Sequence, residues 1–132
     1  MLSAVDSSVL LDVVCNDPFY AARSEALLRQ AATDGGLIVC EAVLAEIRPA
    51  FSAAAFQDFL RDWQLRFVPA SLATATLAGE QFARYVQRGG RAPRVVADFL
   101  IGAHAVVQAE RLLARDRSYL REYFPSLKVS PP

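Results

Sequence analysis

The sequence predicts an α/β fold: one three-layer α/β/α domain of 132 residues with a central, mostly parallel sheet. Four short strand-like runs alternate with longer segments of helical periodicity, which is typical of parallel strands connected by helices. The runs cover residues 2–5, 37–40, 66–68 and 111–114. The run Leu37–Cys40 is apolar throughout, as expected of a strand covered on both faces.

The first strand leads directly into polar residues. Residues 2–5 are followed by Asp6, Ser7 and Ser8, after which an apolar helical pattern resumes. We expect this strand to be central and to deliver Asp6 to the C-terminal edge of the sheet, where open α/β sheets bind ligands. An aspartate there is also an ordinary helix N-cap. The role of Asp6 therefore depends on whether other acids reach the same edge.

Turn and capping signals predict the remaining elements. Pro18 stands where a helix can begin, Gly35-Gly36 can end it, Ser71 is a suitable N-cap and Pro93 can open a further helix. The predicted helices cover residues 18–33, 42–47, 52–63, 71–87 and 93–109, and residues 128–129 are predicted as an edge strand. The predicted core side of the last helix holds Val96, Phe99, Leu100, Ala103 and Val107.

Composition narrows the classes of function. The net charge is zero, but residues 84–132 hold nine basic and four acidic side chains, and 13 of the 14 basic residues are arginine. Arginine suits phosphate, so an anionic polymer is an allowed substrate. Neither a membrane-spanning apolar run nor a signal-peptide pattern is evident, which favours a cytoplasmic location. Cys15 and Cys40 are expected to be buried free thiols.

Four acidic residues are candidates for a metal site. Asp6 and Asp116 follow the first and fourth predicted strands, while Glu46 and Asp98 lie on predicted helices. The segment around Asp98 is strongly apolar, where an isolated charge is unfavourable without a partner. Carboxylates that converge repel one another until a cation neutralises them. Because no histidine or cysteine accompanies these acids, Mg²⁺ or Mn²⁺ suits them better than zinc.

The order and spacing of five segments resemble a known family. These are residues 5–12 (VDSSVLLD), 42–47 (AVLAEI), 97–105 (ADFLIGAHA), 112–119 (LLARDRSY) and 123–129 (YFPSLKV). On these segments the chain resembles a PIN-domain ribonuclease of the VapC toxin type over nearly its whole length. The resemblance implies a PIN-like α/β/α fold. It also implies an endoribonuclease that depends on Mg²⁺, or on Mn²⁺ in its place, and that is the toxin of a VapBC-type toxin–antitoxin pair.

The resemblance also implies which residues act. The family's metal-binding acids fall on Asp6, Glu46, Asp98 and Asp116 of this sequence. We expect Asp6, Asp98 and Asp116 to hold the ion directly. Glu46 is expected to bind it through water or to orient the attacking water.

Neighbouring positions support the same interpretation with two departures. The family's hydroxyl after the first aspartate falls on Ser7, where threonine is more usual, and Ser8 replaces the usual asparagine. The second departure questions one supporting hydrogen bond but not the acidic cluster. Arg115 and Arg117 flank the last acid and are candidate contacts to the RNA backbone.

Partners are implied as well: an RNA substrate, a cognate antitoxin protein and a second copy of the chain in a homodimer. The hydrophobic fraction of 54% and the mean hydropathy of +0.24 favour surplus apolar surface for such an interface. Candidate interface residues are Ala50, Phe51, Phe56, Phe59, Leu60 and Trp63. Core packing of two helices explains any one of these side chains equally well.

Other classes of protein fit these residues less well. A phosphotransfer domain also uses strand-edge acids, but Ser7 and Ser8 stand where it needs a second one. A non-catalytic RNA- or protein-binding PIN-like module has no need to keep four acids, and DNA-directed relatives generally have longer chains with more acids.

His104 lies about 120° around the helix from Asp98, which favours a packed histidine over a general base. Asp12 and Asp17 are expected to be solvated or capping acids.

Overall fold

In the computed structural model, which describes residues 1–90 and 95–132, five strands form a parallel sheet in the order β3-β2-β1-β4-β5. The strands are β1 (Ser3–Val5), β2 (Leu37–Val39), β3 (Leu65–Phe67), β4 (Arg111–Leu113) and β5 (Val129–Ser130). Each neighbouring pair runs parallel, and β1 pairs with both β2 and β4. The predicted α/β fold and the central position of the first strand are confirmed.

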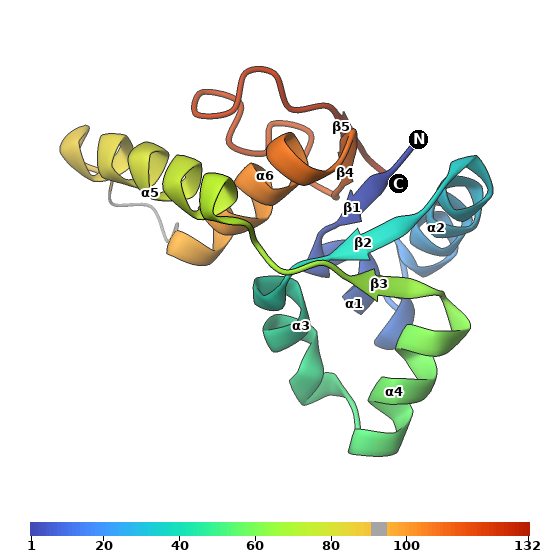
Figure 1. Ribbon diagram of the computed structural model, residues 1–132. Helices are drawn as coiled ribbons and strands as arrows, with labels where there is room; N and C mark the ends of the chain where they lie inside the picture. Colours follow the sequence, from blue (N-terminus) through green and yellow to red (C-terminus); the bar gives the residue numbers. More distant parts are fainter. Residues whose placement is uncertain (91–94) are drawn as a thin grey trace.

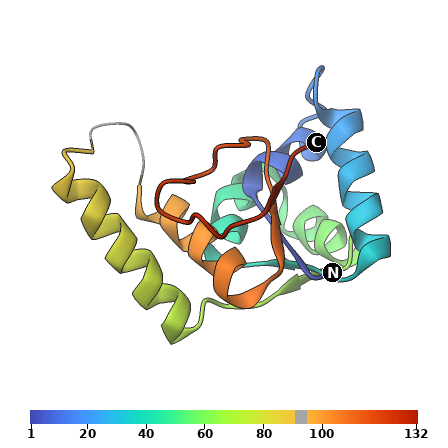
Figure 2. The ribbon, with the colours of Figure 1, turned by 90° about the horizontal axis from the view of Figure 1, so that it is seen from above.

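Helices cover both faces of the sheet. They are α1 (Ser7–Val14), α2 (Ala21–Asp34), α3 (Glu41–Ile47), α4 (Ala53–Asp62), α5 (Leu72–Gln87) and α6 (Val96–Gln108), with a 3₁₀ turn at Arg48–Ala50. Figure 1 shows α5 and α6 on one side of the sheet and α1, α3 and α4 on the other, and Figure 2 shows α2 and α5 at opposite ends of the molecule. The chain steps from β1 outward to β2 and β3 and then returns to β4 beside β1. This reversal places the crevice for a ligand beyond the C-terminal ends of β1 and β4.

Most predicted elements are present, with shifted ends. The helix expected from Pro18 begins at Ala21, and the third strand lies one residue earlier than expected, at Leu65–Phe67. The last strand is Val129–Ser130 and forms the predicted sheet edge. The predicted helix start at Pro93 lies outside the described residues.

The predicted core face of α6 is only partly correct. Phe99 and Ala103 are fully buried, but Val96 is 48% exposed and Val107 is 42% exposed. Val96 is the first residue of α6 and Val107 lies next to its last residue, whereas the middle of the helix is buried around a wide arc. Position along the helix therefore decides burial here more than the face of the helix does.

The C-terminal segment after β4 packs closely on α6. Gly102 permits this contact, because a Cβ atom at this position would lie 2.7 Å from the Phe124 ring. Phe124, Tyr119 and Leu120 are all buried in the hydrophobic core. The segment that carries Asp116 is therefore anchored on the same helix that carries Asp98.

Two expectations from composition can be compared with the structure. Cys40 is a buried free thiol as predicted, but Cys15 is exposed, because it caps the C-terminal end of α1 rather than facing the core. Among the described residues, no helix is both long enough and apolar enough to cross a membrane.

Candidate active site

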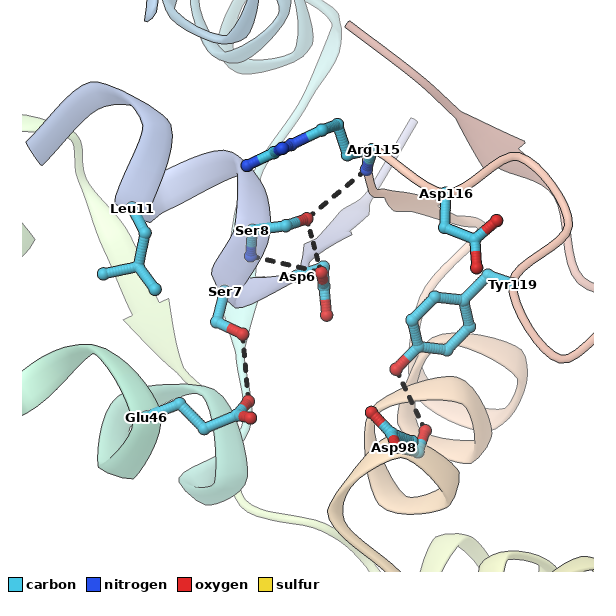
Figure 3. A pocket seen from close by; sticks show the side chains of 9 residues that line it. All are labelled: Asp6, Ser7, Ser8, Leu11, Glu46, Asp98, Arg115, Asp116 and Tyr119. Carbon is cyan, nitrogen blue, oxygen red and sulfur yellow. Dashed lines mark hydrogen bonds between the residues drawn. The ribbon is translucent and has the colours of Figure 1, made fainter. Parts of the chain in front are cut away.

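A pocket of about 440 Å³ opens beyond the C-terminal ends of β1 and β4. Figure 3 shows its lining side chains, which come from the N-cap and first two turns of α1, the end of α3, the start of α6 and the segment after β4. The lining residues are Asp6, Ser7, Ser8, Leu11, Glu46, Asp98, Arg115, Asp116 and Tyr119. All four acids predicted from the sequence thus line one pocket.

Asp6 is both an N-cap and a pocket residue. Its backbone N–H donates to the Leu113 carbonyl at 2.9 Å, which ties it to β4. Its Oδ2 accepts from the Ser8 N–H at 3.1 Å and from Ser8 Oγ at 2.5 Å. Burial raises the pKa of the Asp6 carboxyl, and the hydrogen bonds from Ser8 lower it by less. The nearby charge of Asp98 raises this pKa further. The N-cap interpretation of Asp6 is confirmed, and the same side chain also lines the pocket.

Glu46 is held in the pocket by Ser7. Ser7 Oγ donates to Glu46 Oε1 at 2.9 Å, so the hydroxyl after the first aspartate supports the acid of α3. Desolvation raises the pKa of Glu46, the Ser7 hydrogen bond opposes this, and the charges of Asp6 and Asp98 add to the increase. Three of the four acids therefore repel one another across the pocket.

The other two acids are held by their own segments. Asp98 Oδ2 accepts from the Val95 N–H at 3.1 Å and so caps the first turn of α6. Asp116 Oδ1 accepts from the N–H of Ser118 at 2.9 Å and from its Oγ at 2.8 Å. Tyr119, which the sequence analysis did not single out, donates from its hydroxyl to the Asp98 carbonyl at 3.0 Å. This bond joins the two acid-bearing segments.

Ser8 makes a supporting hydrogen bond to Asp6, although it stands where the family usually has asparagine. Its Oγ donates to Asp6 Oδ2 and accepts from the Arg115 N–H at 3.3 Å. One small hydroxyl thus connects the acid after β1 to the backbone after β4. A hydrogen bond to Asp6 is retained at this position.

The donor set suits a hard divalent cation by its chemistry. All four acids offer carboxylate oxygens, and a cation would offset the burial, and to a lesser degree the mutual repulsion, that raise the pKa of Asp6 and Glu46. Within residues 1–90 and 95–132, however, no three histidine, cysteine, aspartate or glutamate side chains are gathered closely enough to hold a metal ion. The carboxylates line the pocket while bonded to nearby groups, so binding one cation would require their side chains to move closer together.

The prediction for Asp12 is wrong, because this acid is buried and paired with Arg115, whose RNA contact stays a prediction. The Arg115 guanidinium turns away from the acids in Figure 3, and its Nη2 lies 2.6 Å from Asp12 Oδ1. Asp12 is therefore a buried, paired acid and not a solvated or capping one. Arg117 is exposed beside Asp116 but does not line the pocket.

Asp17 and His104 behave as expected. Asp17 Oδ1 accepts from the N–H groups of Phe19 and Tyr20, each at 2.9 Å, which caps the turn before α2. His104 is buried, and its Nε2 donates to the Val68 carbonyl at 2.8 Å. Burial lowers the pKa of His104. It packs inside the protein, away from the pocket-lining residues.

The raised pKa of Asp6 leads to a test of stability against pH. The folded protein binds this proton more tightly than the unfolded chain does, so stability falls as the pH rises between the unfolded and folded pKa values. Asp6→Asn removes the titration and keeps an acceptor for the Ser8 N–H. We expect the metal-free variant to be more stable than wild type at neutral pH, with the difference vanishing in acid. Denaturant unfolding at both pH values measures this, and a variant less stable than wild type at neutral pH would contradict it.

Comparison with known proteins identifies this acid-lined α/β sheet as a PIN domain. The family model of the PIN domain matches residues 4–124. The chain belongs to the PIN domain family. No curated protein sequence matches it significantly.

Solved structures share the fold over nearly the full chain. VapBC2 from Rickettsia felis, solved bound to a promoter DNA fragment, matches with 18% identity and a TM-score of 0.74, over 99% of this chain and 98% of that one. VapBC-1 from nontypeable Haemophilus influenzae matches with 16% identity and a TM-score of 0.68, over 99% of this chain and 98% of that one. FitAcB from Neisseria gonorrhoeae matches with 16% identity and a TM-score of 0.67, over 98% of this chain and 96% of that one. At these identities the likeness establishes the fold.

Proposed function

We propose that this PIN domain is a divalent-metal-dependent endoribonuclease and the toxin of a toxin–antitoxin pair. The observation that carries the proposal is that acids from four separate segments line one pocket at the switch point of the sheet. Mutual repulsion of carboxylates favours a bound cation, and the PIN fold is typical of nucleases.

The four acids divide the work of phosphodiester hydrolysis. Asp6, Asp98 and Asp116 would hold the cation, and Glu46 would bind it through water or orient the attacking water. When bound, Mg²⁺ or Mn²⁺ polarises the phosphate and lowers the pKa of a bound water. Ser7 keeps the Glu46 carboxylate on the pocket side through its 2.9 Å hydrogen bond.

The substrate is proposed to be RNA, held by its phosphates. Arg117 follows Asp116 in the sequence and is exposed. The Arg121 guanidinium donates to the backbone carbonyl of Arg117 at 3.1 Å. Arg84 and Arg88 both lie over the Tyr123 ring, at 5.9 Å from its centroid. These side chains belong to the basic part of the chain and offer charge-assisted hydrogen bonds to a phosphate backbone.

The proposal is tested by cleavage of RNA with the purified chain. We expect cleavage of transfer, ribosomal or messenger RNA in Mg²⁺ or Mn²⁺ and none in EDTA. RNA binding that is the same with metal and with EDTA, without cleavage of any of these RNAs, would instead favour a non-catalytic RNA-binding module.

The antitoxin is proposed to bind a second, aromatic pocket of about 500 Å³. Its floor includes Phe51, Phe59 and Trp63, and the Arg29 guanidinium lies 5.1 Å from the centre of the Trp63 ring. The aromatic side chains are half-buried, so they both pack on the core and face the pocket. An apolar floor with charged residues at its rim suits an amphipathic segment of a protein partner. The similar structures VapBC and FitAcB carry the names of two-component pairs, which supports this choice.

Trp63→Ser is expected to weaken the antitoxin complex by about 30-fold or more, as for a central aromatic contact worth about 2 kcal/mol. Titration of the partner onto the purified toxin measures this. Leu72→Ser, at an exposed residue of α5, is the control and should change nothing. If Trp63→Ser also abolished metal binding, Trp63 would be acting as a core residue.

A further inference from the structure

An ion pair with one buried member, beside the acidic pocket, is not used by the proposed chemistry. The Asp12 side chain is 1% exposed, and its Oδ1 lies 2.6 Å from Arg115 Nη2. Asp12 Oδ2 accepts from Ser24 Oγ at 2.7 Å, and the Arg115 guanidinium lies 4.4 Å from the centre of the Tyr20 ring. The pair therefore joins the end of β4 to α1 and α2.

The backbone of Arg115 connects this ion pair to the acids. Its N–H donates to Ser8 Oγ, which donates to Asp6 Oδ2 at 2.5 Å. The next residue along the chain is Asp116. Asp12 thus fixes the side chain of Arg115, and Ser8 fixes its backbone. Arg115 lies immediately before Asp116 and is connected to Asp6 through the Ser8 hydroxyl.

Stability alone is a poor reason for such a pair. Burying the Asp12 charge is costly, and the attraction of a partly exposed guanidinium largely offsets that cost without a clear surplus, so a well-packed apolar residue is often equally stable. The geometry points to a different role. We propose that Asp12 and Arg115 are positioning residues, which fix the end of β4 so that Asp116 and Asp6 can bind the same divalent cation. This inference rests on the proposed metal-dependent function.

The test is calorimetric Mn²⁺ binding by the full chain without RNA. Arg115→Met is expected to weaken Mn²⁺ affinity by about 10- to 100-fold, the usual effect of removing support from metal ligands. It also leaves Asp12 buried without a cation, so its melting temperature should fall. The double variant Asp12→Asn/Arg115→Met removes that charge, and we expect it to regain stability but not affinity. Arg115→Lys keeps the charge and should restore part of the affinity.

Arg111→Gln is the matched control, at the opposite end of the same strand. Arg111 Nε donates to Ser3 Oγ at 2.8 Å, and its Nη2 lies 3.4 Å from Asp34 Oδ2, so the substitution breaks an ion pair on β4 away from the pocket. Its Mn²⁺ affinity should equal that of wild type.

The outcomes separate this inference from the proposed function. If wild type bound no Mn²⁺, the metal-dependent function itself would be wrong, and the inference with it. If wild type and Arg115→Met bound Mn²⁺ equally, or if affinity returned together with stability in the double variant, only the positioning role would be wrong.

Discussion

Asp98→Asn is expected to reduce metal-dependent RNA cleavage by about 1000-fold or more. Asp98 lines the pocket and contributes to the negative charge that raises the pKa of Asp6 and Glu46. Losing a carboxylate that holds the cation removes several kcal/mol of stabilisation from the transition state, and about 4 kcal/mol corresponds to this factor. Single-turnover cleavage of RNA in Mg²⁺ measures the loss.

The variant should remain folded, which makes the result interpretable. Asparagine retains a side-chain oxygen for the Val95 N–H, so the first turn of α6 stays capped. Asp58→Asn is the matched control, because Asp58 is an exposed acid paired with Arg61 on α4 and lies outside the pocket. Cleavage by folded Asp98→Asn at the wild-type rate would remove Asp98 from the metal site.

Phe99→Ala is expected to destabilise the protein by about 3–5 kcal/mol, a large share of the stability of an ordinary domain. Phe99 is fully buried and lies next to Asp98 in the sequence. Its ring contacts four others, with centroid distances of 5.3 Å to Phe82, 5.5 Å to Tyr85, 5.4 Å to Tyr123 and 6.2 Å to Phe124. Alanine would leave a cavity where α5, α6 and the C-terminal segment meet. Denaturant unfolding monitored by circular dichroism measures the change.

Two further variants show whether this effect comes from packing. Phe99→Leu fills part of the cavity and should lose less stability than Phe99→Ala. Phe19→Ala removes a ring that is 83% exposed and should stay within about 0.5 kcal/mol of wild type. If Phe99→Ala were as stable as Phe19→Ala, the aromatic cluster would not be holding α6 in place.

By itself, the sequence determined the alternation of strands and helices along the chain and the central position of β1. It also determined the edge of the sheet at which the acids lie. These features follow from local patterns, because short apolar runs alternate with helical ones and parallel strands bring their C-terminal ends to one edge. Asp6 directly follows β1 and Asp116 lies three residues after β4, so their meeting could be predicted from the order of the elements alone. The placement of Glu46 and Asp98 in the same pocket followed from the family resemblance.

Only the tertiary structure decided which polar side chains are paired and which apolar ones are covered. Asp12 reads as a solvated acid in its own segment, but its partner Arg115 lies 103 positions away. Val96 and Val107 share the apolar pattern of α6 and are nevertheless exposed at its two ends. Burial and ion pairing depend on segments that are distant in the sequence. Local periodicity carries no information about them, and the pairing of Arg115 with Asp12 depends on how the end of β4 packs against α1 and α2.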